Sequence, residues 1–285
     1  MSWPSSHQGQ FPISVVASKH MPSSTAAATT TPTTSSLTTL GTKLGIDLAA
    51  AGIASFFVAP FITTVDRAVI ENAAGARPLK KALVEISRDF VRNPLQFIRR
   101  KEFLLIYGVY TATYLSANAV DSLCETVEVD SNMPKFLSTT AVNMGACIIK
   151  DREFTRMFGV IAPTKFPLMS MGLFAIRDSL TVGASFIAPP ILSAKFQELG
   201  QTPRTSNTLA QLTCPMLVQF LSTPLHLLSL DLYNNKGVPM NQRMSFISRE
   251  YIKSTGARVA RVVPAFGFGG IGNKYFRDTM RTKLL

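Results

Sequence analysis

The stretch FVAPFITTVDR, residues 57–67, has a proline in the middle of an apolar run and ends in a polar, charged tail. Proline removes one backbone hydrogen bond from a helix and bends it. Inside a membrane, this is tolerated only where neighbouring groups or cavity water bind the freed carbonyl. The stretch therefore indicates a bent membrane helix that contributes to a gate or, alternatively, a helix in which the proline only relieves packing strain.

The composition also indicates a membrane protein. Of the 285 residues, 46% are hydrophobic and only 16% are charged, whereas a soluble domain has about a quarter charged residues. The formal net charge is +12, but the Lys and Arg residues fall in short connectors and form no long basic face, so nucleic-acid binding is not predicted.

No pattern in the sequence predicts catalysis, a metal or a cofactor. Cys124, Cys147 and Cys214 are far apart and form no CxxC or Cys/His cluster, so they indicate neither a zinc site nor a disulfide framework. The glycines of GFGGIG, residues 267–272, do not lie between a strand and a phosphate-binding turn. We therefore predict that the protein is not an enzyme.

Hydropathy and composition divide the chain into a tail and six apolar segments. Residues 1–40 are rich in Ser, Thr, Pro and Ala and are predicted to be a disordered tail. The second and fifth apolar segments are the cleanest. The predicted membrane spans are residues 44–66, 103–122, 136–157, 166–190, 207–233 and 256–277.

The charges of the connectors alternate along the chain. Basic residues outnumber acidic ones in residues 67–102, 150–165 and 231–261, whereas residues 121–135 hold four acids and one lysine. The basic connectors therefore lie on one side of the membrane and both termini on the other. This pattern predicts three helical hairpins, in repeats of residues 41–130, 131–200 and 201–285.

From about residue 42 onward, the segments resemble the mitochondrial carrier family. Odd helices of that family end in Pro-x-[Asp/Glu]-x-x-[Lys/Arg]. The sequence has Pro60 and Arg67 in register in the first repeat, IKDREFTR (residues 149–156) in the second, and PLHLLSLD (residues 224–231) in the third. The resemblance implies an all-α membrane protein with six tilted transmembrane helices, in three pseudo-repeated hairpins around a central cavity.

The same resemblance implies a gate at the ends of the odd helices. In the family, an acid and a base after each proline form a ring of ion pairs. Most of these positions are neutral here, so we expect a gate held mainly by apolar packing, with a His226–Asp151 contact and no wider salt-bridge network. His226 is alternatively an interior histidine that bonds a backbone carbonyl. The predicted gate residues are Pro60, Ile62, Val65, Asp151, Phe154, Pro224 and His226.

Arginines on the even helices are the predicted substrate contacts. Arg177 lies in an apolar segment, where facing lipid would cost a few kcal/mol, so it either binds an anion in a transport path or is held by an acid on a neighbouring helix. Asp178 is adjacent but is expected to point elsewhere around the helix. Arg261, with Arg258 three residues earlier on the same face, makes a positive mouth for an anionic ligand or for phospholipid head groups such as cardiolipin.

We therefore predict a solute carrier that moves a small anionic or zwitterionic metabolite by alternating access. Its substrate would contact Arg177, Asp178 and Arg261. The alternative is a membrane adaptor that has lost transport and recruits partners or lipids; it predicts a filled bundle axis instead of a cavity. We expect a monomer in the mitochondrial inner membrane, with the outer mitochondrial and peroxisomal membranes as alternatives.

Overall fold

The computed structural model describes residues 34–159, 167–186 and 188–285, and these residues form helices and their connections without a strand. The helices are α1 (Thr34–Ala73), α2 (Leu79–Arg92), α3 (Pro94–Ile98), α4 (Lys101–Thr126), α5 (Asn132–Phe158), α6 (Leu168–Phe186), α7 (Ala188–Glu198), α8 (Pro203–Asn234), α9 (Met240–Ala260), a π-helix η1 (Val263–Gly270) and α10 (Ile271–Leu284).

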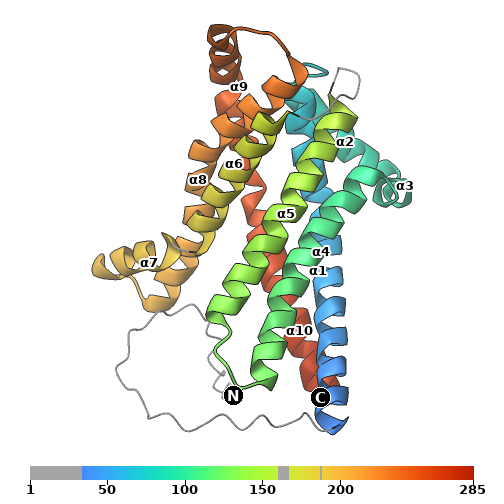
Figure 1. Cartoon of the computed structure of the whole chain (residues 1–285), viewed down its shortest axis with the longest axis vertical. Coiled ribbons are helices and arrows are strands. Elements are labelled where there is room, and N and C mark those ends of the chain that lie inside the picture. The colour runs from blue at the N-terminus through green and yellow to red at the C-terminus, as the bar shows by residue number, and fades with distance from the viewer. Residues whose placement is uncertain (1–33, 160–166, 187) are drawn as a thin grey trace, which may run out of the picture.

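The long helices run along one bundle, with α7 projecting sideways (Figure 1). Short helices α2 and α3 and the α8–α9 connection lie at one end, and the start of α1 and the end of α10 lie at the other. The basic connectors over residues 67–102 and 231–261 therefore lie at a single end of the bundle, as the charge pattern predicted, whereas residues 160–165 of the third basic connector lie outside the described residues.

Within the described residues, three helical stretches are long and apolar enough to cross a membrane: Thr38–Ala73, Lys101–Thr126 and Leu168–Glu198, the last of which passes residue 187. They contain the predicted spans 44–66 and 103–122 and overlap the predicted span 166–190. The other three predicted spans are also helical but do not reach this apolarity. The expectation that residues 207–233 are among the cleanest was wrong, because Ser, Thr, Gln and two prolines lower the hydropathy of α8.

The predicted boundary of the tail was also wrong. Helix α1 begins at Thr34, inside the range assigned to disorder, while residues 1–33 lie outside the described part. Extending an existing helix by one residue costs much less than starting one. The apolar run after Gly45 is therefore sufficient to continue the helix into the Ser/Thr-rich stretch before it.

Buried apolar side chains from α1, α2, α4, α5, α6 and α8 form one core cluster, which includes Val58, Ile62, Phe103, Phe154 and Leu227. At the basic end, α2 packs Leu79, Ala82 and Ile86 inward. The connection before α2 is fixed by Arg77, which bonds Glu71 (Nε to Oε2 2.5 Å) and Glu85. The bond to Glu71 is the main cause that raises the pKa of Arg77 above its usual value.

Pro60 lies inside α1, and Pro215 and Pro224 lie inside α8. Pro224 cannot donate to the carbonyl of Phe220 four residues earlier, and the Tyr251 hydroxyl donates to that oxygen instead, at 2.9 Å. A neighbouring helix thus satisfies the freed carbonyl, which is the condition that the sequence analysis set for a proline inside a membrane helix.

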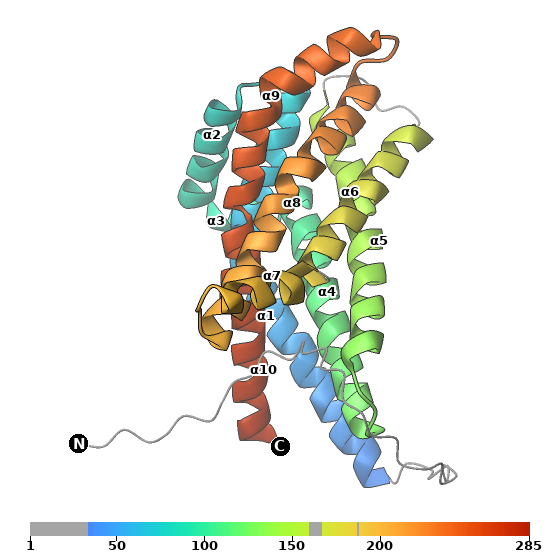
Figure 2. The same ribbon diagram turned by 90° about the vertical axis from the view of Figure 1, so that its left-hand side faces the viewer.

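The C-terminal helices α9, η1 and α10 follow one another along the length of the bundle (Figure 2). The π-helix starts next to Pro264, and the Tyr114 hydroxyl donates to the Ala265 carbonyl at 2.9 Å. Gly269 allows α4 to approach, since a Cβ there would lie 2.1 Å from the Tyr114 hydroxyl oxygen. Along the chain, this irregular segment joins the charged residues Arg258 and Arg261 to the charged residues Arg277 and Arg281.

Candidate functional site

A cavity of about 450 Å³ lies inside the bundle. Its wall is formed by α1, α4, α5, α6, α7, α8, α9 and η1, and it combines apolar side chains with a group of charged ones. The charged side chains of the lining are Asp66, Lys135, Lys150, Arg177, Asp178, Arg258 and Arg261. Hydroxyls and amides from α5, among them Thr139, Thr140 and Asn143, complete the polar lining.

Ion pairs connect five charged side chains of the cavity wall and the buried Asp151 into one cluster, which we call the central network: Asp66, Lys150, Asp151, Arg177, Asp178 and Arg261. Lys150 Nζ lies 2.8 Å from Asp66 Oδ2 and 2.5 Å from Asp151 Oδ1. Arg177 pairs with Asp151 and Arg261 pairs with Asp66. The network joins α1, α5, α6 and the residue after α9.

Burial makes this pairing necessary. Asp151 is fully buried and Arg177 is 3% exposed, and removing an ion from water costs several kcal/mol unless an opposite charge and hydrogen bonds compensate. The expectation of no wider salt-bridge network was therefore wrong. That expectation placed the acid and base positions of the first repeat at Ile62 and Val65, which are neutral. The acid of the first repeat is instead Asp66, one helical turn after Ile62 and on the same face.

His226 contacts Arg177 and not Asp151. Its Nδ1 lies 2.8 Å from Arg177 Nη1. A guanidinium only donates, so Nδ1 accepts and the imidazole is neutral with its proton on Nε2. The predicted His226–Asp151 contact is replaced by a bridge in which Arg177 bonds both side chains.

Asp178 and Arg177, which are adjacent on α6, are in contact with each other. Asp178 does not point away from Arg177, because its Oδ1 accepts from Arg177 Nε at 3.0 Å and from Nη2 at 2.5 Å. Arg177 both lines the cavity and is held by Asp151 of α5. The contact with an acid on a neighbouring helix is thus present, while binding of an anion by Arg177 remains a prediction.

Arg258 and Arg261 were expected to form the mouth of a cavity, but Arg258 is buried. Arg258 is 3% exposed and its Nη2 lies 3.2 Å from Ser222 Oγ. Arg261 is paired with Asp66. Both line the cavity, so they can meet a solute there, but the burial of Arg258 does not fit contact with phospholipid head groups.

The remaining predicted gate residues surround the central network. Ile62 is buried and lines the cavity, and Val65 packs against the core. Phe154 is buried, with its ring centroid 5.6 Å from Lys150 Nζ. Apolar packing and ion pairs therefore occur together at this level of the bundle, near Pro60, which is buried, and Pro224, which is partly exposed.

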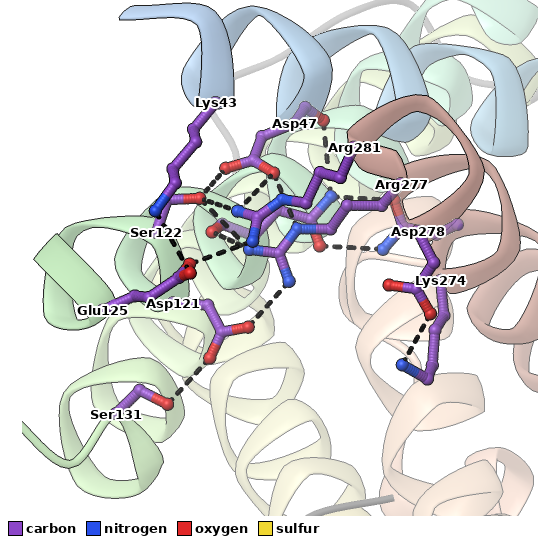
Figure 3. A network of polar contacts seen from close by, with 12 residues as sticks. Lys43, Asp47, Asp121, Ser122, Glu125, Ser131, Lys274, Arg277, Asp278 and Arg281 are labelled. Atoms are coloured by element: carbon purple, nitrogen blue, oxygen red, sulfur yellow. Dashed lines mark hydrogen bonds and ion pairs between the residues drawn. The ribbon is translucent and has the colours of Figure 1, made fainter. Parts of the chain in front are cut away.

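A second polar cluster lies at the other end, between α1, α4 and α10 (Figure 3). We call it the terminal network: Lys43, Asp47, Asn118, Asp121, Ser122, Glu125, Asn273, Arg277 and Arg281. Arg277 lies 2.7 Å from both Asp47 and Asp121, and Arg281 lies 2.9 Å from Glu125. Asn118 and Asn273 exchange amide hydrogen bonds of 2.9 and 3.0 Å.

The terminal network was not predicted from the sequence, although the spacing of its charged residues indicates it. Each of the three helices carries two charged residues four positions apart, which places them on one face. The pairs are Lys43 with Asp47, Asp121 with Glu125, and Arg277 with Arg281. An acidic pair on one helix and a basic pair on another are complementary and predict contact.

The family model described as a probable citrulline exporter matches residues 50–281. The chain belongs to this family. It is thus a multi-pass membrane protein that transports a small-molecule solute, and not an enzyme. A comparison with curated proteins found no match. Among the described residues, no group of three His, Cys, Asp or Glu side chains could hold a metal, and the three cysteines are free.

Membership of this family corrects the assignment to the mitochondrial carriers. Pro60 and the arginines that carried the resemblance are present, but prolines are common in membrane helices of many kinds. An arginine in an apolar segment likewise requires only a wet cavity or an ionic partner. These features are consequences of burying charge in a helical bundle and do not identify one family.

Proposed function

We propose that the protein exports citrulline through the central cavity, which opens alternately to the two sides of the membrane. The cavity carries this proposal, because its volume of about 450 Å³ is within the range of small-molecule sites and its charged wall suits a zwitterion. Citrulline itself is taken from the description of the family. The substrate would contact cavity residues that include Arg177, Asp178 and Arg261.

The cavity supports transport over the adaptor alternative, which predicted a filled axis. Opening it at the basic end would require α1, α5 and α6 to separate at the central network. We propose that Ile62, Val65 and Phe154 seal that end together with Asp151 and His226. Pro60 and Pro224 would let α1 and α8 bend there. Opening at the other end would require the terminal network to break.

We also propose six membrane crossings in three hairpins. Helices α5 and α8 have 27 and 32 residues, which correspond to about 40 Å or more and exceed a hydrocarbon core of about 30 Å. Packing of α1 with α4, α5 with α6, and α8 with α9 supports repeats at residues 41–130, 131–200 and 201–285. We further propose that the protein is a monomer and that phospholipid binds at the basic connectors.

The argument for the mitochondrial inner membrane came from the carrier resemblance and falls with it. The direction of the charge bias is independent of that family. We propose that the end bearing α2, α3 and the α8–α9 connection faces the compartment that retains basic loops.

Two substitutions on α6 test the cavity as the transport path. Thr181 lines the cavity, and Ser179 is exposed on the outside. Each hydroxyl bonds the carbonyl four residues earlier, at 3.0 and 2.9 Å, so the two positions are matched. In proteoliposomes loaded with labelled citrulline, we expect Thr181→Phe to reduce efflux at least about tenfold and Ser179→Phe to leave it near wild type, since only the first ring fills the cavity.

Efflux that is equal in the two variants would exclude this cavity as the path. A wild-type protein that folds, inserts and exports other solutes but not citrulline would overturn the choice of substrate. A wild-type protein that moves no solute would instead support the adaptor alternative.

A further inference from the structure

Arg258 differs from the other buried arginines of the described residues. Arg177 pairs with Asp151 and Asp178, and Arg243 pairs with Asp231. Arg258 has no carboxylate partner among the described residues; its hydrogen bond goes to Ser222 Oγ, and its Nε has no partner. A buried cation without a counter-charge is costly, so a bound anion would stabilise Arg258.

An anion can reach Arg258 through the cavity, which this side chain lines although it is only 3% exposed. The wall is also positive on balance. Lys135, Lys150, Arg177, Arg258 and Arg261 line the cavity, against the carboxylates of Asp66 and Asp178 and that of Asp151, which pairs with Lys150 and Arg177 behind the wall. A bound carboxylate would reduce this excess of positive charge.

The same cavity also offers a place for a cation. Asp178 lines it, and while its Oδ1 accepts from Arg177, its Oδ2 is buried without a hydrogen-bond partner among the described residues. Ser222, which bonds Arg258, and His226, which bonds Arg177, are one turn apart on α8 and share a face. Arg258 and the Arg177–Asp178 pair are therefore both anchored to α8 and both line this cavity.

We infer that Arg258 and Asp178 form a subsite for the backbone of an α-amino acid, in which Arg258 binds the carboxylate and Asp178 Oδ2 binds the ammonium group. The inference rests on the proposed function and adds the residues that recognise the substrate. An amino-acid backbone carries both charges, which matches a cavity wall that offers, within the described part of the chain, one cation without a carboxylate partner and one free carboxylate oxygen.

The rest of the cavity selects a neutral polar side chain. Thr139 and Thr140 line it, and both hydroxyls are buried without hydrogen-bond partners among the described residues. They can bond a ureido group, whereas a cationic side chain would add charge to a wall that is already positive. The subsite therefore binds citrulline better than ornithine, which has an ammonium group in place of the ureido group.

The test uses full-length protein in proteoliposomes and competition against labelled citrulline. Citrulline methyl ester lacks the carboxylate charge, and Nα-acetylcitrulline lacks the ammonium charge. For the wild type, we expect each compound, and ornithine, to compete at least about tenfold more weakly than citrulline, the size of one lost charged hydrogen bond. This measurement needs no variant and is independent of folding.

Two variants then assign each charge to its residue. Arg258→Gln should raise the half-saturating citrulline concentration about tenfold or more and remove the discrimination against the ester alone. Asp178→Asn should remove the discrimination against the acetyl compound alone. The control is Arg249→Gln on the same helix, whose side chain is 72% exposed and whose loss should change neither value. If Arg258→Gln does not fold, Arg258→Lys keeps the charge and should weaken citrulline binding less.

Equal competition by citrulline and its ester in the wild type would overturn the inference while leaving citrulline export intact. The same holds if Arg258→Gln keeps full discrimination. Failure of the proposed function looks different: the wild type would not move citrulline. In that case, citrulline but not its ester should still raise the melting temperature of the purified protein if the subsite is correct, and the absence of such a shift would overturn the subsite as well.

Discussion

The two charged clusters of the bundle differ in whether the arginines have carboxylate partners. In the terminal network, Arg277 and Arg281 each contact carboxylates of α1 or α4, and neither side chain lines the cavity. Beside the central network, Arg258 faces the cavity and has no carboxylate partner in the part of the chain that the structure describes. Arginine–carboxylate pairs join helices, whereas a cation without a carboxylate beside a cavity leaves a place for a solute.

The largest expected effect is in the central network. Asp151→Asn removes the carboxylate that pairs with both Lys150 and Arg177, leaving Lys150 with Asp66 alone and Arg177 with Asp178 alone. We expect the free energy of unfolding to fall by about 3–5 kcal/mol, measured by denaturation of the purified protein in mixed detergent. The control is Glu153→Gln, two residues later on the outer side of α5, for which we expect a loss below about 1 kcal/mol.

Equal stability of Asp151→Asn and the wild type would mean that the buried charges do not depend on one another. The central network would then not hold α5 against α6, and the distinction between the two clusters would fail.

A smaller effect is expected at the terminal network. Arg277→Gln removes the contacts with Asp47 and Asp121, but the side chain of Asp121 is 28% exposed, so water compensates part of the loss. We expect a loss of about 2–3 kcal/mol in the same denaturation measurement, below the range for fully buried pairs. The half-saturating citrulline concentration should stay unchanged, because Arg277 does not line the cavity.

A matched substitution sharpens this contrast. Lys274→Gln removes an exposed pair with Asp278 on the same helix, and such pairs contribute about 0–1 kcal/mol. A raised half-saturating concentration in Arg277→Gln, with normal values in Lys274→Gln, would show that the terminal network also acts on substrate binding.

The sequence predicted the general organisation better than the contacts. Long apolar segments and connector charges depend on composition over many residues, and they located α1, α4 and α6 and the basic end of the bundle. Pairing between distant helices depends on which faces meet, and composition does not contain that information. Asp66 and Lys150 stood in the quoted motifs, yet their 2.8 Å contact follows from the packing of α1 against α5.

The predicted site residues illustrate the same limit. Arg177 was identified because an isolated arginine in an apolar segment is unfavourable, and the structure places it on the cavity wall. Arg258 was treated as the less important neighbour of Arg261. Its lack of a partner is visible only when every acid near it has been assigned to another cation.

Two adjacent glycines of the π-helix η1, Gly269 and Gly270, should differ in how well they tolerate substitution by alanine. In Gly269→Ala, the new Cβ would lie 2.1 Å from the Tyr114 hydroxyl oxygen and 3.1 Å from Val58. Overpacking of this kind costs about 1–3 kcal/mol, which the melting temperature should report. Gly270 has nothing within 4 Å of the corresponding position, so Gly270→Ala is the control and should be near neutral.

The additional substitution Tyr114→Phe tests the cause of this loss. It removes the oxygen that obstructs the new methyl group, and the double variant should be less destabilised than the sum of the two single ones. Additive losses would mean that the backbone of the π-helix, and not contact with α4, determines the effect.

The smallest predicted effect concerns the prolines. In Tyr251→Phe, the Phe220 carbonyl loses the hydrogen bond that replaces the one missing at Pro224, and we expect a loss of about 0.5–1.5 kcal/mol. Tyr275→Phe removes a hydroxyl from a side chain that is 64% exposed and serves as the control. In a Pro224→Ala background, the restored backbone N–H can donate to Phe220, so Tyr251→Phe should cost less there. An unchanged cost would show that Tyr251 stabilises the contact between α8 and α9 independently of the proline.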